Sequence, residues 1–150
     1  ISVTGSSGKT TTKDLIYHIL SQSYCGTRTR GTYNGLSSHC RTILCTMPWH
    51  RFCVLEVAAG LPDSIARAVS LVPPDMGVVL NIGLEHFSLM RTREATAASK
   101  ELVVTCLPET GTAFINTNDP LVEAMSYRKR ARVVRVGRDE RPNLKISGDA

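Results

Sequence analysis

Residues 3–12 read Val3-Thr4-Gly5-Ser6-Ser7-Gly8-Lys9-Thr10-Thr11-Thr12, and this stretch decides how the chain folds. A short apolar approach, Ile1-Ser2-Val3, precedes it, and an apolar helical stretch with Leu15 and Ile19 follows it. A strand, a glycine-containing loop and a helix, in that order, let backbone N–H groups converge on an anion at the N-terminus of the helix. Residues 4–12 therefore predict a phosphate-binding loop.

The side chains of this loop fit a nucleoside triphosphate with magnesium. Lys9 can reach the outer phosphates, and the hydroxyl of Thr10 is placed to bind Mg²⁺. The usual pattern has a glycine where this chain has Val3, so that the loop reads Gly-x-x-Gly-Lys-Thr. A plain turn that caps a helix through Ser6 or Ser7 is the competing interpretation. The predicted nucleotide-binding set is Gly5, Ser6, Ser7, Gly8, Lys9, Thr10 and Thr11.

Length and composition indicate one soluble globular domain. The chain has 150 residues, of which 42% are hydrophobic and 21% are charged, and this length is sufficient for a hydrophobic core. It contains no apolar run that could cross a bilayer and no signal peptide pattern, so we expect a cytoplasmic protein without membrane insertion. The chain starts at Ile1, inside a predicted strand, which suggests a piece of a longer protein.

The cysteines indicate reduced thiols in a cytosolic protein. Their number is odd, none forms a Cys-x-x-Cys pair, and no histidine stands at the spacing of a zinc site. We expect them to be buried and to pack as small hydrophobic side chains. The five cysteines are Cys25, Cys40, Cys45, Cys53 and Cys106.

Much of the net charge of +5 comes from the C-terminal part of the chain, from Arg128 to Arg141. Neither interleaved aromatic residues nor a nucleic-acid motif accompanies these cations, so we expect no nucleic-acid partner. A solvated helix end and strand edge is the favoured interpretation, and steering of an anionic substrate is a weaker alternative.

Strand and helix patterns alternate along the chain. Predicted strands cover residues 1–3, 52–57, 76–82, 112–116 and 132–136. Predicted helices cover 11–23, 65–71 with Asp63 or Ser64 as the cap, 92–106, and a short segment opened by Asp119-Pro120. The stretch from residue 24 through Asn34-Gly35 is predicted to be loop. The alternation predicts an α/β fold with a mainly parallel sheet flanked by helices, like that of P-loop NTPases.

Polar residues follow several of these strands. Glu56 ends an apolar run, Asn81 and His86 follow the next strand, and residues 116–119 follow another. In parallel sheets, ligands bind beyond the carboxyl ends of the strands, where the loop at residues 5–10 would also lie. These residues therefore predict a single site.

Three ionisable residues have both a functional and a structural interpretation. A carboxylate in an apolar strand, as at Glu56, is costly unless it binds a metal or forms an ion pair within the sheet. His86 is either a structural histidine or a metal ligand beside the phosphate loop. Lys100 lies on a small, apolar helix face, and by composition alone it would be a surface lysine.

The pattern resembles the central, ATP-binding domain of the Mur ligases, the cytoplasmic enzymes that build peptidoglycan precursors. The order and spacing of the motifs match over nearly the whole chain, and the shortened phosphate loop is the form found in this family. The matching stretches are residues 4–12, 55–58, 74–75, 81–83, His86, 98–101, 107–111 and 116–119.

The resemblance implies an ATP-dependent ligase in which a carboxylate attacks the γ-phosphate of ATP and an amine displaces the resulting acyl phosphate. By analogy, Lys9 contacts the β- and γ-phosphates, while Thr10 and Glu56 hold one Mg²⁺. His86 would hold a second Mg²⁺ together with Lys100, because the matching lysine of the family is carbamylated and therefore anionic. Carbamylation needs a neutral amine, which burial of a lysine can supply.

Within the family, the pattern looks most like the branch that adds D-alanyl-D-alanine to a UDP-muramoyl-tripeptide. The implied partners are ATP, a UDP-linked muramoyl peptide and an amino acid or dipeptide amine, and we expect a monomer. Asn34 matches a residue that faces substrate, although the loop at residues 33–36 lacks the usual Gly-x-Pro and residues 57–59 lack a usual glycine. Residues 1–150 would form a central domain, incomplete at its C-terminal end and inactive without the UDP-binding and C-terminal domains.

Three other interpretations stay open. A folylpolyglutamate, cyanophycin or pseudomurein ligase would share the chemistry. A P-loop NTPase or kinase of another function could use Glu56 as its metal-binding carboxylate, but it does not predict His86 and Lys100. A degenerate, non-catalytic homologue is disfavoured because Lys9 and the predicted metal ligands are intact.

Overall fold

The structure is a computed structural model, which describes residues 1–60, 63–83, 92–127, 131–138 and 144–145. Its centre is one seven-stranded sheet in which every pair of neighbouring strands runs parallel. The strands are β1 (Ser2–Thr4), β2 (Gly26–Arg28), β3 (Phe52–Glu56), β4 (Met76–Val79), β5 (Thr112–Asn116), β6 (Arg132–Gly137) and β7 (Leu144–Lys145). Their order across the sheet is β2-β3-β1-β4-β5-β6-β7.

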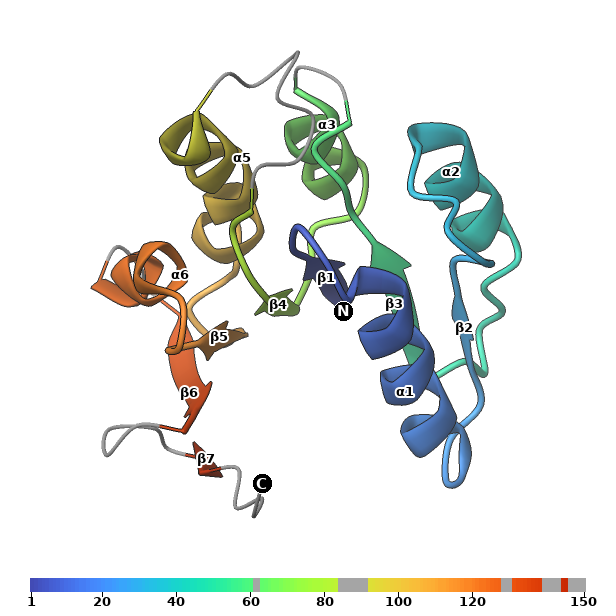
Figure 1. The fold of residues 1–150 in the computed structure, drawn as a ribbon. Helices are drawn as coiled ribbons and strands as arrows, with labels where there is room; N and C mark the ends of the chain where they lie inside the picture. Colours follow the sequence, from blue (N-terminus) through green and yellow to red (C-terminus); the bar gives the residue numbers. More distant parts are fainter. Residues whose placement is uncertain (61–62, 84–91, 128–130, 139–143, 146–150) are drawn as a thin grey trace.

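Helices cover both sides of this sheet. They are α1 (Lys9–Ser21), α2 (Leu36–Leu44), α3 (Ser64–Leu71), α5 (Arg93–Thr105) and α6 (Pro120–Ala124), followed by the 3₁₀ turn η1 (Met125–Tyr127). Figure 1 shows α3 and α5 on one side of the sheet and α1 on the other. The predicted α/β fold with a parallel sheet is therefore confirmed. No helix among the described residues combines the length and apolar character needed to cross a membrane.

The hydrophobic core lies mainly under α3 and α5. One cluster joins β4 and β5 to α5 and α6, and a second joins β3 to α3 and α5. Gly77 in β4 permits the close approach of α5, because a Cβ at this position would lie 2.6 Å from the carbonyl oxygen of Val103. The apolar runs of the central strands are thus explained by burial between helix layers.

The topology places the end of β1 at a switch point. β1 pairs with β3 on one side and with β4 on the other, and the chain extends the sheet outward in both directions from there. In open parallel sheets, the crevice at such a point is the usual position of a ligand. The loop at residues 5–8, Glu56 and Asn81 follow β1, end β3 and follow β4, respectively, and so meet at this crevice.

The prediction that residues 24–35 form loop was wrong in part, and the helix α2 was not predicted. β2 has only three residues and no apolar alternation, and it forms because it pairs with β3, with Arg28 opposite Val54. α2 buries the polar residues His39 and Thr42 and leaves the apolar Leu36 and Leu44 exposed, so its buried face is not the apolar face that periodicity would indicate.

Two local predictions also need correction. Asp63 occupies the N-cap position of α3 with a φ of 60° but makes no side-chain cap hydrogen bond, and the hydroxyl of Ser64 donates instead to the carbonyl of Ala58. All five cysteines are free thiols, but none is buried: Cys25 and Cys45 are exposed, and Cys40, Cys53 and Cys106 are half-buried. Burial raises the pKa of the half-buried Cys53 and Cys106, which makes them poor nucleophiles.

Candidate active site

The loop between β1 and α1 has the backbone of a phosphate-binding loop. Gly8 adopts a left-handed φ of 77°, and a Cβ on Gly5 would lie 2.8 Å from the Cβ of Leu80. Gly8 is the N-cap of α1 and no side chain caps the helix, so the interpretation of a turn capped by Ser6 or Ser7 was wrong. The first turn of α1 therefore points backbone N–H groups out of the helix toward the crevice.

Asn81 holds this loop in place from the neighbouring strand. Its Oδ1 accepts hydrogen bonds from the backbone N–H groups of Ser6 at 2.9 Å and Ser7 at 2.8 Å. The hydroxyl of Ser6 accepts a further bond of 2.7 Å from the N–H of Gly83. Because these contacts occupy the two serine amides, the donors that face an anion are those of the first turn of α1.

The ammonium group of Lys9 lies folded over the loop. Its Nζ donates to the carbonyl oxygens of Gly5 at 2.8 Å and Ser6 at 3.0 Å. This position places the cation at the N-terminus of α1, where the helix dipole also favours negative charge. The predicted contact of Lys9 with the outer phosphates of a nucleotide is compatible with this position and stays a prediction.

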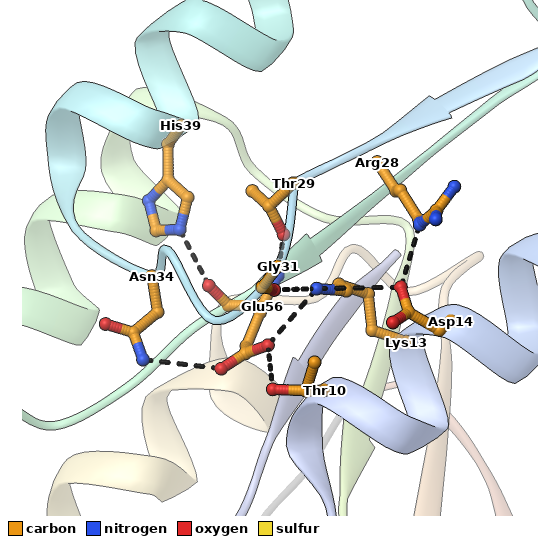
Figure 2. Close-up of polar contacts among 9 residues, drawn as sticks. All are labelled: Thr10, Lys13, Asp14, Arg28, Thr29, Gly31, Asn34, His39 and Glu56. Atoms are coloured by element: carbon orange, nitrogen blue, oxygen red, sulfur yellow. Dashed lines mark hydrogen bonds and ion pairs between the residues drawn. The ribbon is translucent and has the colours of Figure 1, made fainter.

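Glu56 is the buried centre of the site, with 1% of its surface exposed. Its Oε2 accepts a hydrogen bond of 2.8 Å from the hydroxyl of Thr10, and its Oε1 accepts one of 3.3 Å from the side-chain amide of Asn34. The hydroxyl of Thr29 accepts a 3.0 Å bond from the Glu56 N–H, and the His39 Nε2–H donates over 2.8 Å to the Glu56 carbonyl. Figure 2 shows these side chains pointing at Glu56 from α1, α2 and the segment after β2.

Lys13 is a member of this site that the sequence reasoning missed. Its side chain is fully buried, its Nζ lies 3.4 Å from Glu56 Oε2, and it donates to the carbonyl of Gly31. Asp14 lies 3.7 Å away and is itself paired with Arg28 at 2.7 Å (Figure 2). The spacing of three residues from Thr10, which puts both on one face of a helix, was the available signal. Glu56 therefore forms an ion pair in addition to its contact with Thr10, but the partner is Lys13 of α1 and not a residue of the sheet, as the structural interpretation had it.

The contact between Thr10 and Glu56 fits a magnesium ion. Two oxygen ligands at right angles around Mg²⁺, each about 2.0–2.1 Å from the ion, lie about 2.9 Å apart. The oxygens of Thr10 and Glu56 are 2.8 Å apart, so both could bind one ion with little movement. The described residues contain no group of three His, Cys, Asp or Glu side chains around a common metal position. Water and nucleotide phosphates would complete the coordination, as is usual for Mg²⁺.

The predicted second metal site is described only in part. His86 lies outside the described residues, so its role stays a prediction. Lys100 lies on α5 with 0% of its surface exposed, and the interpretation as a surface lysine is therefore wrong. Burial is the condition that carbamylation of a lysine requires.

Polar residues at the end of β5 and just after it brace the crevice. Asp119 accepts hydrogen bonds from the N–H of Ile82 at 2.7 Å and from the N–H of Leu121 at 3.0 Å, where it caps α6. The amide of Asn116 donates to the carbonyl of Leu80 over 2.7 Å. These bonds fix the segment after β4, which in turn carries Asn81.

A glycine-containing loop at the switch point of a parallel sheet, with a buried carboxylate facing its threonine, defines a P-loop nucleotide-binding domain. Comparison with known proteins gives the family: residues 3–148 match the model of the Mur ligase middle domain. The chain therefore belongs to the Mur ligase family, as the sequence motifs predicted.

Relatives within the family point to one branch. The chain is 38% identical over 139 residues to UDP-N-acetylmuramoyl-tripeptide--D-alanyl-D-alanine ligase of Mycobacterium bovis, which covers 93% of this chain but only 27% of that protein. Its structure also matches that of the MurF ligase of Thermotoga maritima in complex with ADP, with a TM-score of 0.84 and a sequence identity of 32%. The match covers 92% of this chain and 32% of the Thermotoga chain.

The name of a third relative states the peptide on which that enzyme acts. It is UDP-N-acetylmuramoylalanyl-D-glutamyl-2,6-diaminopimelate--D-alanyl-D-alanyl ligase of Acinetobacter baumannii, with a TM-score of 0.81 and 27% identity over 91% of this chain and 30% of that protein. The present chain thus spans about 27% to 32% of the length of these relatives.

Proposed function

We propose that residues 1–150 act as the central ATP-binding domain of a larger ligase that joins D-alanyl-D-alanine to a UDP-muramoyl-tripeptide. The observation that carries the proposal is the contact of the loop hydroxyl of Thr10 with the buried carboxylate of Glu56. Support for the substrates comes from the relatives, including the alanyl-D-glutamyl-2,6-diaminopimelate arm in the name of the Acinetobacter enzyme. A UDP-binding domain and a C-terminal domain would complete the enzyme, which we expect to be a cytoplasmic monomer.

The residues of this domain would act mainly by binding and orienting ATP. The N–H groups at the start of α1 and the ammonium of Lys9 would hold the β- and γ-phosphates. The terminal carboxylate of the tripeptide attacks the γ-phosphorus, ADP leaves, and the amine then displaces phosphate from the acyl phosphate to form the amide. Charge accumulates on phosphoryl oxygens during the first step, so the cations and backbone donors at the N-terminus of α1 stabilise the transition state.

Magnesium fits the same site. Thr10 and Glu56 would hold one ion, and His86 with a carbamylated Lys100 would hold a second. The ions would neutralise phosphate charge and polarise the γ-phosphoryl group. Asn34, which donates to Glu56 Oε1, would fix the orientation of that carboxylate and face the tripeptide beyond it.

The test is to measure ADP release by the full-length ligase that contains this domain, with ATP and Mg²⁺. We expect sustained, multiple-turnover ADP release only when both the UDP-muramoyl-tripeptide and D-alanyl-D-alanine are present, because the tripeptide alone can form the acyl phosphate and release at most one ADP per enzyme. Sustained release with ATP and Mg²⁺ alone would favour the NTPase alternative, and sustained release with D-alanyl-D-alanine replaced by another amino acid would favour a different ligase of the same family.

A further inference from the structure

A hollow lies beside the candidate active site, between β2, the segment after it and α2. Its volume is about 440 Å³, and three arginines line it, Arg28, Arg30 and Arg41. Tyr33 and Ser37 also line it, and no carboxylate is among its lining residues. The phosphate loop contributes no residue to this hollow.

Among the described residues, a carboxylate compensates the charge of one of the three arginines. Arg28 pairs with Asp14 at 2.7 Å and stacks 4.1 Å over the ring of Tyr17. Arg30 and Arg41 are exposed, and within the part of the chain that the structure describes no carboxylate lies within ion-pair distance of either guanidinium. Two like charges that line one hollow repel each other, so an anion between them is favoured.

The helix α2 adds to the positive potential of the hollow. It begins at Leu36, its N-cap is Gly35, and no side chain caps it. Ser37 and Ser38, in its first turn, both line the hollow. The positive end of the helix dipole and two serines therefore face the same space as Arg30 and Arg41, and guanidinium groups and hydroxyls are the donors that bind carboxylates well.

The hollow adjoins the site of the proposed reaction. Tyr33 lines it, and the next residue, Asn34, donates to the carboxylate of Glu56. A peptide whose terminal carboxylate reacts beside Glu56 would therefore have a neighbouring part within reach of Arg30 and Arg41. The proposed tripeptide arm carries such anions, because its glutamyl and diaminopimelate residues each keep one carboxylate that does not react.

We propose that Arg30 and Arg41 bind a non-reacting carboxylate of the peptide arm and thereby select an acidic tripeptide. This inference rests on the proposed function, since it names how that substrate is recognised. Guanidinium–carboxylate pairs strengthen substrate binding, so the effect belongs in the KM for the peptide and not in the KM for ATP.

The experiment compares three substrates with the full-length ligase: the acidic UDP-muramoyl-tripeptide and two counterparts in which either the glutamyl or the diaminopimelate carboxylate is an amide. The variant is Arg30→Gln/Arg41→Gln. Its control is Arg51→Gln, an exposed arginine that does not line the hollow. We expect the double variant to raise the KM for the acidic peptide by about tenfold, with kcat and the KM for ATP within about twofold.

The decisive measurement is how the KM for the peptide depends on the charge of the substrate. One of the two amides should raise the KM of the unmodified enzyme by a similar factor, and the double variant should then discriminate no longer between this amide and the acid. An equal rise of KM for all three substrates would overturn the proposal, since the arginines would then bind the diphosphate or act on the fold.

A binding measurement separates this inference from the proposed function. If the unmodified enzyme forms no amide, the proposed function fails, and free alanyl-D-glutamyl-diaminopimelate is then titrated by calorimetry into the protein loaded with a non-hydrolysable ATP analogue. Weaker binding to Arg30→Gln/Arg41→Gln than to Arg51→Gln would still support the carboxylate site. Equal binding to both variants would overturn it.

Discussion

The hydroxyl of Thr10 donates a 2.8 Å hydrogen bond to Glu56 Oε2, and this bond joins the first turn of α1 to the end of β3. The two oxygens already have the separation of neighbouring magnesium ligands, about 2.9 Å. Lys13, fully buried 3.4 Å from the same carboxylate oxygen, compensates the charge of Glu56. The domain therefore holds a carboxylate ready at a buried position where an unpaired charge would be costly.

Replacement of Glu56 by glutamine tests the metal role. Glu56→Gln keeps an oxygen that can accept from Thr10 but removes the negative charge that a hard cation requires. We expect the Mg²⁺ concentration for half-maximal ligation to rise by about tenfold or more. The control Glu109→Gln removes an exposed carboxylate in the turn before β5 and should leave the magnesium dependence unchanged. An unchanged dependence in Glu56→Gln would reduce Glu56 to a structural ion pair.

The ion pair of Lys13 and Glu56 predicts that substitutions of the two residues have non-additive effects on the free energy of unfolding. Lys13→Met leaves the buried carboxylate of Glu56 without its cation, which should lower the free energy of unfolding by about 3 kcal/mol. In Lys13→Met/Glu56→Gln, both charges are absent, so the loss should be smaller than the sum of the two single losses. Urea unfolding of the four proteins measures the coupling, and strictly additive losses would show that the two side chains act independently.

The parts of the fold that could be predicted from the sequence are those marked by residues close together in the chain. Strand β5 was predicted with its observed bounds, because an apolar run follows the turn at residues 108–111. Thr92 and Asp119 were placed correctly at the starts of α5 and α6, since a capping side chain and a proline are read within a few residues.

Features that depend on distant partners were missed. The burial of His39 and Lys13 follows from their contacts with Glu56, which is 17 and 43 residues away along the chain. No periodicity marks such residues, because they are polar and their neighbours are set by the sheet order. The hollow lined by Arg30 and Arg41 was missed for the same reason, since it exists only once β2 and α2 lie side by side.

The phosphate loop predicts a sharp difference between two glycines. In Gly5→Ala, the new Cβ would meet the Cβ of Leu80 at 2.8 Å and the carbonyl oxygen of Ser7 at 3.3 Å, so the loop must shift. Overpacking of this kind costs about 1–3 kcal/mol, and we expect the KM for ATP to rise by about tenfold. Gly60→Ala is the matched control, because nothing lies within 4 Å of a Cβ there. Equal KM values for ATP in the two variants would contradict the assigned role of the loop.

The buried Lys100 predicts an anionic role as a carbamate. Lys100→Ala should be nearly inactive yet partly rescued by a short-chain carboxylate that refills the vacated position. Lys100→Arg should stay inactive, because a permanent guanidinium cation would repel a second Mg²⁺. Carbon-13 NMR of the full-length enzyme with labelled bicarbonate should show a carbamate resonance. Absence of that resonance, together with normal ligation by Lys100→Arg, would exclude the carbamate.

The most direct test of the proposed function follows an oxygen atom. The tripeptide substrate is labelled with oxygen-18 in its terminal carboxylate and is incubated with ATP, Mg²⁺, D-alanyl-D-alanine and the full-length ligase. If an acyl phosphate forms, one labelled oxygen leaves with the phosphorus, and mass spectrometry of the inorganic phosphate should show a single oxygen-18 per turnover. Lys9→Ala, which lacks the cation over the loop, should form neither amide nor labelled phosphate. Unlabelled phosphate released together with amide, or normal turnover by Lys9→Ala, would contradict the account.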